Sequence, residues 1–168
     1  MQRPPADSEL GKLMATLPRP GRVEWIGLRP ARMAPMDEVG EVVAETGAGL
    51  AGDRYAAGSG KRGVTLIQAE HLPVIAALSG HAAVSPATLR RNLVVSGLPL
   101  VALKGRRFRV GQTLLEGTDS CDPCSRMEAA LGPGGFNAMR GHGGLCARIV
   151  EGGTIRVGDA VVALPDAS

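Results

Sequence analysis

Short apolar runs broken by glycine recur along the chain from residue 22 onward. Runs rich in Val, Ile and Leu between turn residues are typical of β-strands. We therefore expect strands over residues 23–28, 41–45, 63–67, 93–95, 108–110, 113–116 and 145–150. Helical spacing is less common. One amphipathic helix is expected within residues 1–20, a second over 69–78, and a third that Ser85 and Pro86 open.

Two segments, 107–115 and 154–162, resemble each other. Each contains Arg-Val-Gly followed by a polar residue and an apolar run, and each predicts a strand, a glycine turn and a second strand. Two copies are too few for a solenoid or a propeller, which need at least three stacked units. The sequence therefore predicts a mainly β fold with a few short helices, in which these segments form two similar corners of one closed sheet, a small β-barrel.

Composition and charge narrow the class of protein. The chain has 168 residues, of which 24 are glycine and 12 proline, so many tight turns are expected and a long coiled coil is excluded. No apolar run approaches the ~20 residues of a membrane-spanning helix. The 19 basic and 16 acidic residues nearly balance, which does not favour nucleic-acid binding. With three cysteines and no secretory block, we predict a soluble, cytoplasmic protein with no membrane or nucleic-acid partner.

The segment 119–132 carries the strongest chemical signal. It predicts a helix in which Asp122 is the N-cap and Pro123 the first helical residue, with a glycine at the far end. Cys124 would then lie in the first turn, where free backbone N–H groups and the cation of Arg126 favour a thiolate. A nucleophile or a metal ligand follows from that position, and an inert small hydrophobic residue is the alternative.

The spacing of Cys121 and Cys124 also raises a redox dithiol and a zinc site. A thioredoxin-like dithiol needs a βαβ unit around the motif, whereas a strand pair precedes it here. A zinc site would use Cys121, Cys124, His142 and Cys146, but the sequence contains only one Cys-x-x-Cys pair. Cys146 lies in an apolar strand pattern, and we interpret it as a buried structural cysteine.

Glycine-rich loops beside basic residues form a second signal. The loop 58–63 lacks the Ser or Thr of a nucleotide-binding phosphate loop, and the first glycine of that motif is also missing. Such loops suit an anionic ligand, the alternative being ordinary turns at the surface. The basic residues concerned are Arg54, Lys61, Arg62, Arg140 and Arg148. Arg91 and Asn92 end a short helix before a strand, so they either face the strand mouth or cap the helix.

Six blocks occur along the chain: Gly-Leu-Ala-Gly-Asp-Arg-Tyr at 49–55, Arg-Gly-Val-Thr-Leu-Ile-Gln at 62–68, Arg-Asn-Leu-Val-Val-Ser-Gly at 91–97, Pro-Cys at 123–124, Gly-His-Gly-Gly at 141–144 and Gly-Thr-Ile-Arg-Val-Gly-Asp at 153–159. In residues and in order they resemble the MOSC domain, found at the C-terminus of molybdenum cofactor sulfurases and in stand-alone bacterial proteins. The resemblance covers about residues 22–164, which leaves an N-terminal appendage at 1–21 and a tail at 165–168. It implies a MOSC-type, pyruvate-kinase-like β-barrel.

The resemblance also implies a role for Cys124. In that family the matching cysteine carries sulfur or binds the molybdenum of a pterin cofactor, molybdopterin. Candidates for binding the cofactor and its phosphate in this chain are Arg54, Lys61, Arg62, Arg91, Asn92, Arg126, Arg140, His142 and Arg148. Cys121 lies outside the family pattern and is left open as a resolving thiol or a disulfide partner of Cys124. The additional domains of larger relatives are missing, so a reductase or a cysteine desulfurase is expected to be a separate partner protein.

Three hypotheses follow for the function. In the first, Cys124 binds the molybdenum cofactor, and an oxo-molybdenum centre reduces a small N-oxygenated substrate. In the second, Cys124 accepts a persulfide from a pyridoxal-phosphate cysteine desulfurase and delivers the sulfur to an acceptor. The third is a structural zinc protein of the same fold. We expect the cationic loops to converge on Cys124, and we expect Cys124 to be the most reactive of the three thiols.

Overall fold

A computed structural model describes residues 2–55 and 60–166 of the chain. The first residue of the expected appendage, positions 58–59 of the glycine-rich loop and the last two residues of the expected tail lie outside the described residues. The division into appendage, domain and tail therefore stays a prediction.

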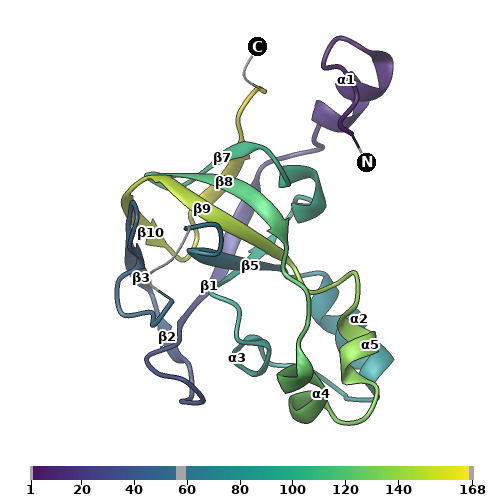
Figure 1. Cartoon of the computed structure of the whole chain (residues 1–168), viewed down its shortest axis with the longest axis vertical. Helices are drawn as coiled ribbons and strands as arrows, with labels where there is room; N and C mark the ends of the chain where they lie inside the picture. The colour runs from purple at the N-terminus through teal and green to yellow at the C-terminus, as the bar shows by residue number, and fades with distance from the viewer. Residues whose placement is uncertain (1, 56–59, 167–168) are drawn as a thin grey trace.

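Within the described residues, seven strands close into a barrel (Figure 1). They are β1 (Gly21–Leu28), β5 (Val64–Gln68), β6 (Leu93–Ser96), β7 (Arg107–Val110), β8 (Thr113–Ser120), β9 (Leu145–Glu151) and β11 (Ala160–Ala163). Their order is β11-β7-β8-β9-β5-β6-β1, and β1 pairs again with β11, where Gly21 lies opposite Val161. Closure leaves these strands without the free edges that invite pairing between chains. The predicted mainly β barrel is confirmed.

In the described part of the chain, four further strands lie outside the ring. β2 (Asp37–Val39) pairs with β1, and β10 (Gly153–Arg156), β3 (Glu41–Glu45) and β4 (Gly49–Leu50) form a small sheet. The two similar sequence segments therefore differ in their pairing. Strands β7 and β8 form a hairpin, whereas β10 pairs with β3 and β11 belongs to the barrel. The second segment is thus a corner between two sheets, because β10 finds its hydrogen-bonding partner in β3.

The helices are short. They are α1 (Glu9–Ala15), α2 (His71–Ser79), α3 (Pro86–Leu89), the 3-10 helix η1 (Leu100–Leu103), α4 (Ser125–Leu131) and α5 (Gly135–Met139). α1 stands apart from the barrel, while α2, α4 and α5 gather on one side of it (Figure 1). No helix in the described part of the chain is long and apolar enough to cross a membrane.

Two helix boundaries differ from the sequence prediction. α4 begins at Ser125, because Cys124 has extended backbone angles (φ −123°, ψ 176°), so Asp122 is not its N-cap and Pro123 is not its first residue. α5 (Gly135–Met139) is a further helix, which the sequence did not predict. The carboxylate of Glu128 accepts hydrogen bonds from the amides of Gly134 and Phe136, which supplies this helix start with the acceptors it lacks locally.

Two apolar clusters place the helices on the barrel. Inside the barrel, Leu66 of β5 packs in a cluster with Phe108 and Leu115. The next residue, Ile67, faces outward and packs in a second cluster whose helical members are Ile75, Leu89, Met127, Leu131 and Met139. Strand β5 is buried on both faces because successive side chains point in opposite directions. The second cluster fixes α4, and with it the residue that precedes the helix, Cys124.

Candidate functional site

Cys124 ends a short connection, 121–124, that leads from β8 to α4. The amide of Cys121 donates to the carbonyl of Gly144 (2.9 Å), which ties this connection to the chain just before β9. The carbonyl of Cys124 accepts a hydrogen bond from the amide of Met127, so Cys124 is the N-cap of α4 and not a first-turn residue. Its side chain is exposed. Because α4 has only seven residues, exposure is the stronger reason to expect reactivity.

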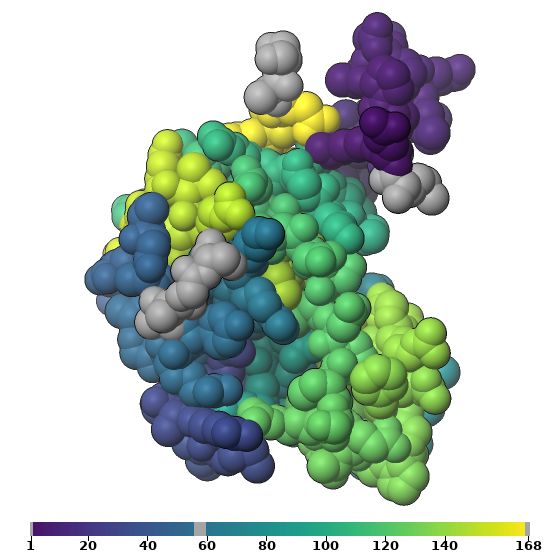
Figure 2. Space-filling view, in the orientation of Figure 1, coloured from purple at the N-terminus to yellow at the C-terminus, as the bar shows by residue number. Residues whose placement is uncertain are grey.

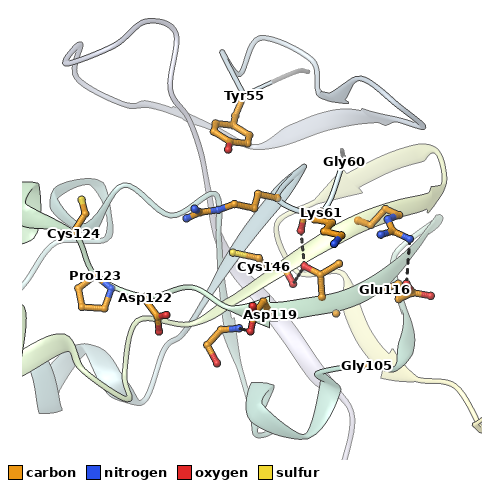
Figure 3. Close-up of a pocket in the computed structure, with 15 residues that line it drawn as sticks. Tyr55, Gly60, Lys61, Gly105, Glu116, Asp119, Asp122, Pro123, Cys124 and Cys146 are labelled. Carbon is orange, nitrogen blue, oxygen red and sulfur yellow. Dashed lines mark hydrogen bonds and ion pairs between the residues drawn. The ribbon is translucent and has the colours of Figure 1, made fainter. Parts of the chain in front are cut away.

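A cavity of about 760 Å³ lies beside Cys124. Its size falls within the range of small-molecule sites. Most of its described lining comes from β8, β9, the chain around 60–62 and the connection to α4, and Tyr55 and Gly105 complete it. The residues are Tyr55, Gly60, Lys61, Arg62, Gly105, Glu116, Gly117, Thr118, Asp119, Ser120, Asp122, Pro123, Cys124, Cys146 and Arg148. Figure 2 shows part of β9, in yellow-green, at the bottom of a hollow between blue and green atoms. In Figure 3, Cys124 lies at one end and Glu116 towards the other.

The charges around this cavity have both signs. Its lining holds the cations Lys61, Arg62 and Arg148 and the carboxylates Glu116, Asp119 and Asp122. Asp119 is paired with Lys104 (Oδ1 to Nζ 2.9 Å), and Glu116 lies 3.5 Å from Arg107 Nε and from Arg148 Nη1. Counting these two outer partners, five described cations meet three carboxylates. This excess of positive charge favours an anionic ligand.

The other two thiols form a buried pair beneath the cavity. Cys146 lines the cavity, and a hydrogen bond from its thiol lowers the pKa of Cys121 to about 6, against the opposing effect of burial. Arg91 and Arg62 add to the lowering, and the pKa of Cys146 is raised by the same hydrogen bond and by burial. Burial works against the charged form of Arg62, but the neighbouring thiols more than offset it and raise the pKa of Arg62. Arg62 therefore both lines the cavity and interacts with the thiol pair.

The side chains of Arg91 and Asn92 are buried and form hydrogen bonds that stabilise the fold. Arg91 donates to three carbonyls, those of Gly143 (2.9 Å), Leu89 (2.9 Å) and Cys121 (3.2 Å). Asn92 is fully buried, accepts from the Thr65 amide and hydroxyl, and donates to the carbonyl of Gly27 and to Asp53. Neither belongs to the cavity lining. Through the carbonyls of Gly143 and Cys121, Arg91 instead positions the connection that carries Cys124.

The remaining basic candidates lie elsewhere. Arg54 and Arg126 lie near Arg90, whose pKa is lowered by burial first and then by repulsion from Arg126, Arg29 and Arg54. The side chain of Arg140 contacts Asn137 at the surface, and His142 bonds the carbonyl of Ala138 and packs edge-on against His71. The structure thus brings Lys61, Arg62 and Arg148 into one cavity with Cys124 and does not bring Arg54, Arg91, Asn92, Arg126, Arg140 or His142 into its lining.

In the Gly-His-Gly-Gly block at 141–144, two glycines allow the backbone to pass very close to neighbouring backbone segments. A Cβ atom on Gly143 would lie 2.1 Å from the carbonyl oxygen of Cys121. On Gly144, where φ is +100°, it would lie 1.9 Å from the carbonyl oxygen of Leu66. Only glycine fits such contacts. These glycines let the chain before β9 pass against β5 and against the connection to Cys124, and they line the smaller cavity described below.

Sequence reasoning missed several residues of the lining. Strand β8 runs to Ser120, past the expected end at residue 116, and so carries Thr118 and Asp119 to the cavity. The Thr118 hydroxyl lies within hydrogen-bonding distance of the carbonyls of Lys61 and Cys146. The ring centroid of Tyr55 lies 5.5 Å from the Arg29 guanidinium carbon. The mixed polar residues after 116 gave no alternation to reveal a continuing strand.

The zinc hypothesis is wrong for this fold. Among the described residues, no group of three or more His, Cys, Asp and Glu side chains is arranged to hold a metal ion. Cys121 and Cys146 contact each other in the interior, whereas Cys124 is exposed and His142 packs on His71. A closed four-ligand site needs all of them around one point.

The structure is that of a closed β-barrel protein with an exposed thiol at the edge of a cavity that is lined by charges of both signs. The chain belongs to the MOSC domain family, whose sequence model matches residues 53–162. No curated protein matches the chain.

Solved structures show the same fold at low sequence identity. The YuaD protein of Bacillus subtilis has a TM-score of 0.76 and 19% identity, with 87% of this chain and 96% of that chain covered. YiiM of Geobacillus stearothermophilus has a TM-score of 0.69 and 17% identity (87% and 76% covered). YiiM of Escherichia coli has a TM-score of 0.67 and 21% identity (88% and 71% covered).

Thiol alkylation tests the placement of the cysteines. In the native protein, iodoacetamide at neutral pH is expected to label Cys124 first, because Cys124 is exposed while Cys121 and Cys146 are 1% and 2% exposed. Mass spectrometry of the labelled peptides gives the order. Faster labelling of Cys146 than of Cys124 would contradict the assignment of Cys124 as the accessible thiol.

Proposed function

We propose that this chain binds the molybdenum cofactor in the 760 Å³ cavity, with Cys124 as the ligand to the metal. One observation carries the proposal. The exposed thiol of Cys124 lies at the edge of a ligand-sized cavity, and Lys61, Arg62 and Arg148 are among the other described residues that line it. Membership of the MOSC family supports it.

The chemistry of the lining fits that group. A thiolate is a soft ligand and suits a redox-active metal, and Cys124 is accessible to one. Guanidinium and ammonium groups bind phosphate through charge-assisted hydrogen bonds, a role open to Arg62, Arg148 and Lys61. Carboxylates accept hydrogen bonds from the N–H groups of a pterin, a role for Asp119 and Asp122.

The proposed reaction is the reduction of a small N-oxygenated compound. When bound, the cofactor would supply the redox chemistry, with electrons from a separate reductase. The chain's own part is to hold and orient: Cys124 fixes one end of the group, and the cations fix its phosphate. Because Cys124 is exposed, the reacting side stays open to a substrate and to an electron-donor protein.

Removal of one cation tests how the cavity holds an anion. Arg148→Ser is expected to weaken retention of the cofactor by about 10- to 150-fold, since a charge-assisted hydrogen bond contributes about 1.5–3 kcal/mol. Arg156→Ser is the matched control, because Arg156 pairs with Glu41 at the surface of the small sheet and does not line the cavity. The measurement is the molybdenum and pterin content of each protein after loading and dialysis. Equal retention by both variants would remove Arg148 from the site.

A second function has one observation in its favour. The exposure of Cys124 also permits contact with the active site of a cysteine desulfurase. The thiolate of Cys124 would attack the outer sulfur of the desulfurase persulfide, so that Cys124 gains the persulfide and the desulfurase cysteine leaves as a thiolate. This sulfur-carrier function needs no metal.

Two measurements on the same purified protein separate the alternatives. Elemental analysis gives the molybdenum per chain, and cyanolysis releases sulfane sulfur from a persulfide. The cofactor proposal expects stoichiometric molybdenum that is lost in Cys124→Ser. Sulfane sulfur on Cys124 with no molybdenum after loading would establish the sulfur carrier in its place.

A further inference from the structure

Cys146 lies in β9, and Cys121 directly follows the end of the neighbouring strand β8. Near the end of the β8–β9 pair, Asp119 lies opposite Cys146 and Ser120 opposite Leu145. The amide of Cys121 continues this pairing by donating to the carbonyl of Gly144. The Cys146 thiol lowers the pKa of Cys121, and Cys121 in turn raises the pKa of Cys146, so the two side chains lie close together in the interior. The fold therefore places the two thiols close together, Cys146 in β9 and Cys121 just past the end of β8.

The pair lies between two cavities. Cys146 lines the 760 Å³ cavity, and Cys121 lines a second cavity of about 190 Å³ together with His71, Lys104 and Gly144. Both thiols are nearly fully buried, so a protein or a bulky reagent cannot reach them. A molecule of a few atoms that enters the second cavity can meet the sulfur of Cys121.

We propose that Cys121 and Cys146 form a redox-active dithiol, which a small peroxide converts into a disulfide. In the first step, the thiolate of Cys121 attacks the peroxide, the O–O bond breaks, and the leaving alkoxide or hydroxide takes up a proton. In the second step, the thiol of Cys146 attacks the resulting sulfenic acid of Cys121, an S–S bond forms and water leaves. In sum, two thiols and one peroxide give one disulfide, one water and one alcohol or second water.

The charges around the pair assign the two roles. The guanidinium of Arg91 donates to the carbonyl of Cys121, and Arg62 approaches both thiols from the cavity side. Both cations and the hydrogen bond from Cys146 favour the thiolate on Cys121, whereas burial and that thiolate keep Cys146 protonated. Cys121 is therefore the attacking thiol and Cys146 the resolving thiol. The spacing of the sequence motif had left Cys124 as the disulfide partner of Cys121, but the fold turns Cys121 to Cys146.

The test uses the full chain with Cys124→Ser, which leaves the buried pair as the only two thiols. Trypsin separates them, because it cuts after Arg109, Arg126, Arg140 and Arg148 and so places Cys121 in peptide 110–126 and Cys146 in peptide 141–148. The reduced protein is treated with hydrogen peroxide, denatured, alkylated and digested. The expected product is one cross-linked pair of these peptides, about 2 Da lighter than their sum and separated by dithiothreitol. Full alkylation of both cysteines after the treatment would overturn the proposal.

A second variant tests the order of attack. With Cys146→Ala added, the sulfenic acid has no resolving thiol, so dimedone added together with denaturant after the peroxide treatment is expected to label Cys121 in peptide 110–126. An unlabelled Cys121 in a folded variant would overturn its assignment as the attacking thiol. If this variant fails to fold, the cross-link in the Cys124→Ser protein alone decides the proposal. Neither measurement involves a cofactor, so its outcome is independent of the proposed function.

Discussion

Cys124→Ser is expected to abolish retention of molybdenum by the folded protein. Loss of a group that only supports a metal ligand typically lowers metal affinity 10–100-fold, so loss of the ligand itself is expected to lower it by about 100-fold or more. The fold should be unaffected, because Cys124 is exposed and contributes to α4 through its backbone carbonyl. Elemental analysis after loading, together with a thermal unfolding curve, separates loss of the ligand from loss of the fold.

Cys121→Ser is the matched control. The hydroxyl replaces a buried thiol that neither lines the large cavity nor faces solvent, so the variant is expected to keep molybdenum while losing some thermal stability. The two variants differ by one sulfur each, three residues apart. Equal molybdenum content in Cys124→Ser and wild type would refute Cys124 as the ligand, and so would loss of the metal from a folded Cys121→Ser protein alone.

Much of the barrel could be predicted from the sequence because strand burial follows local pattern. The runs that include Val64–Gln68 and Leu93–Ser96 are mostly apolar, since both faces of these strands are covered. A glycine and an asparagine mark where the two runs begin. The partner of a strand is not a local property. Thr154 lies opposite Val43, more than a hundred residues away in sequence, and nothing in the segment around either residue distinguishes that pairing from a hairpin with β11.

The candidate site was predicted in part for the same reason. Cys124 is marked by its neighbours in sequence, and Lys61, Arg62 and Arg148 by glycine loops or by a matching block. Arg91 also lies in a matching block, yet its guanidinium donates hydrogen bonds to three carbonyls that come together only in the folded chain. Whether an arginine meets a ligand or a carbonyl depends on which backbone oxygens lie within reach. Residue type and spacing do not contain that information.

The second large effect concerns the buried ion pair of Arg29 and Asp53, where Asp53 is the first residue of the segment that matches the MOSC family model. Both carboxylate oxygens of Asp53 bind Arg29, at 2.9 Å for Oδ2 to Nη2 and 3.1 Å for Oδ1 to Nε, and Asp53 also accepts from the amides of Arg29 and Tyr55. The side chains are 0% and 12% exposed. Asp53→Ala leaves the Arg29 cation and the side-chain amide of Asn92 without this acceptor. The substitution is therefore expected to lower the free energy of unfolding by about 3–5 kcal/mol.

The surface pair of Arg156 and Glu41 provides the control, because both side chains are more than half exposed. Glu41→Ala is expected to change stability by about 0–1 kcal/mol. Burial alone would raise the pKa of Asp53, but the hydrogen bonds and charge of Arg29 outweigh it and lower the pKa of this carboxyl below its usual range.

A carboxyl whose pKa is lowered by folding stabilises the folded state above its unfolded pKa, and this stabilisation is lost as the pH falls through the lower, folded value. The difference between wild type and Asp53→Ala in urea unfolding should therefore be full at pH 7 and shrink as the pH falls below about 4. A difference no larger than that of Glu41→Ala at pH 7, or one that grows on acidification, would show that Asp53 does not anchor Arg29 as an ion pair.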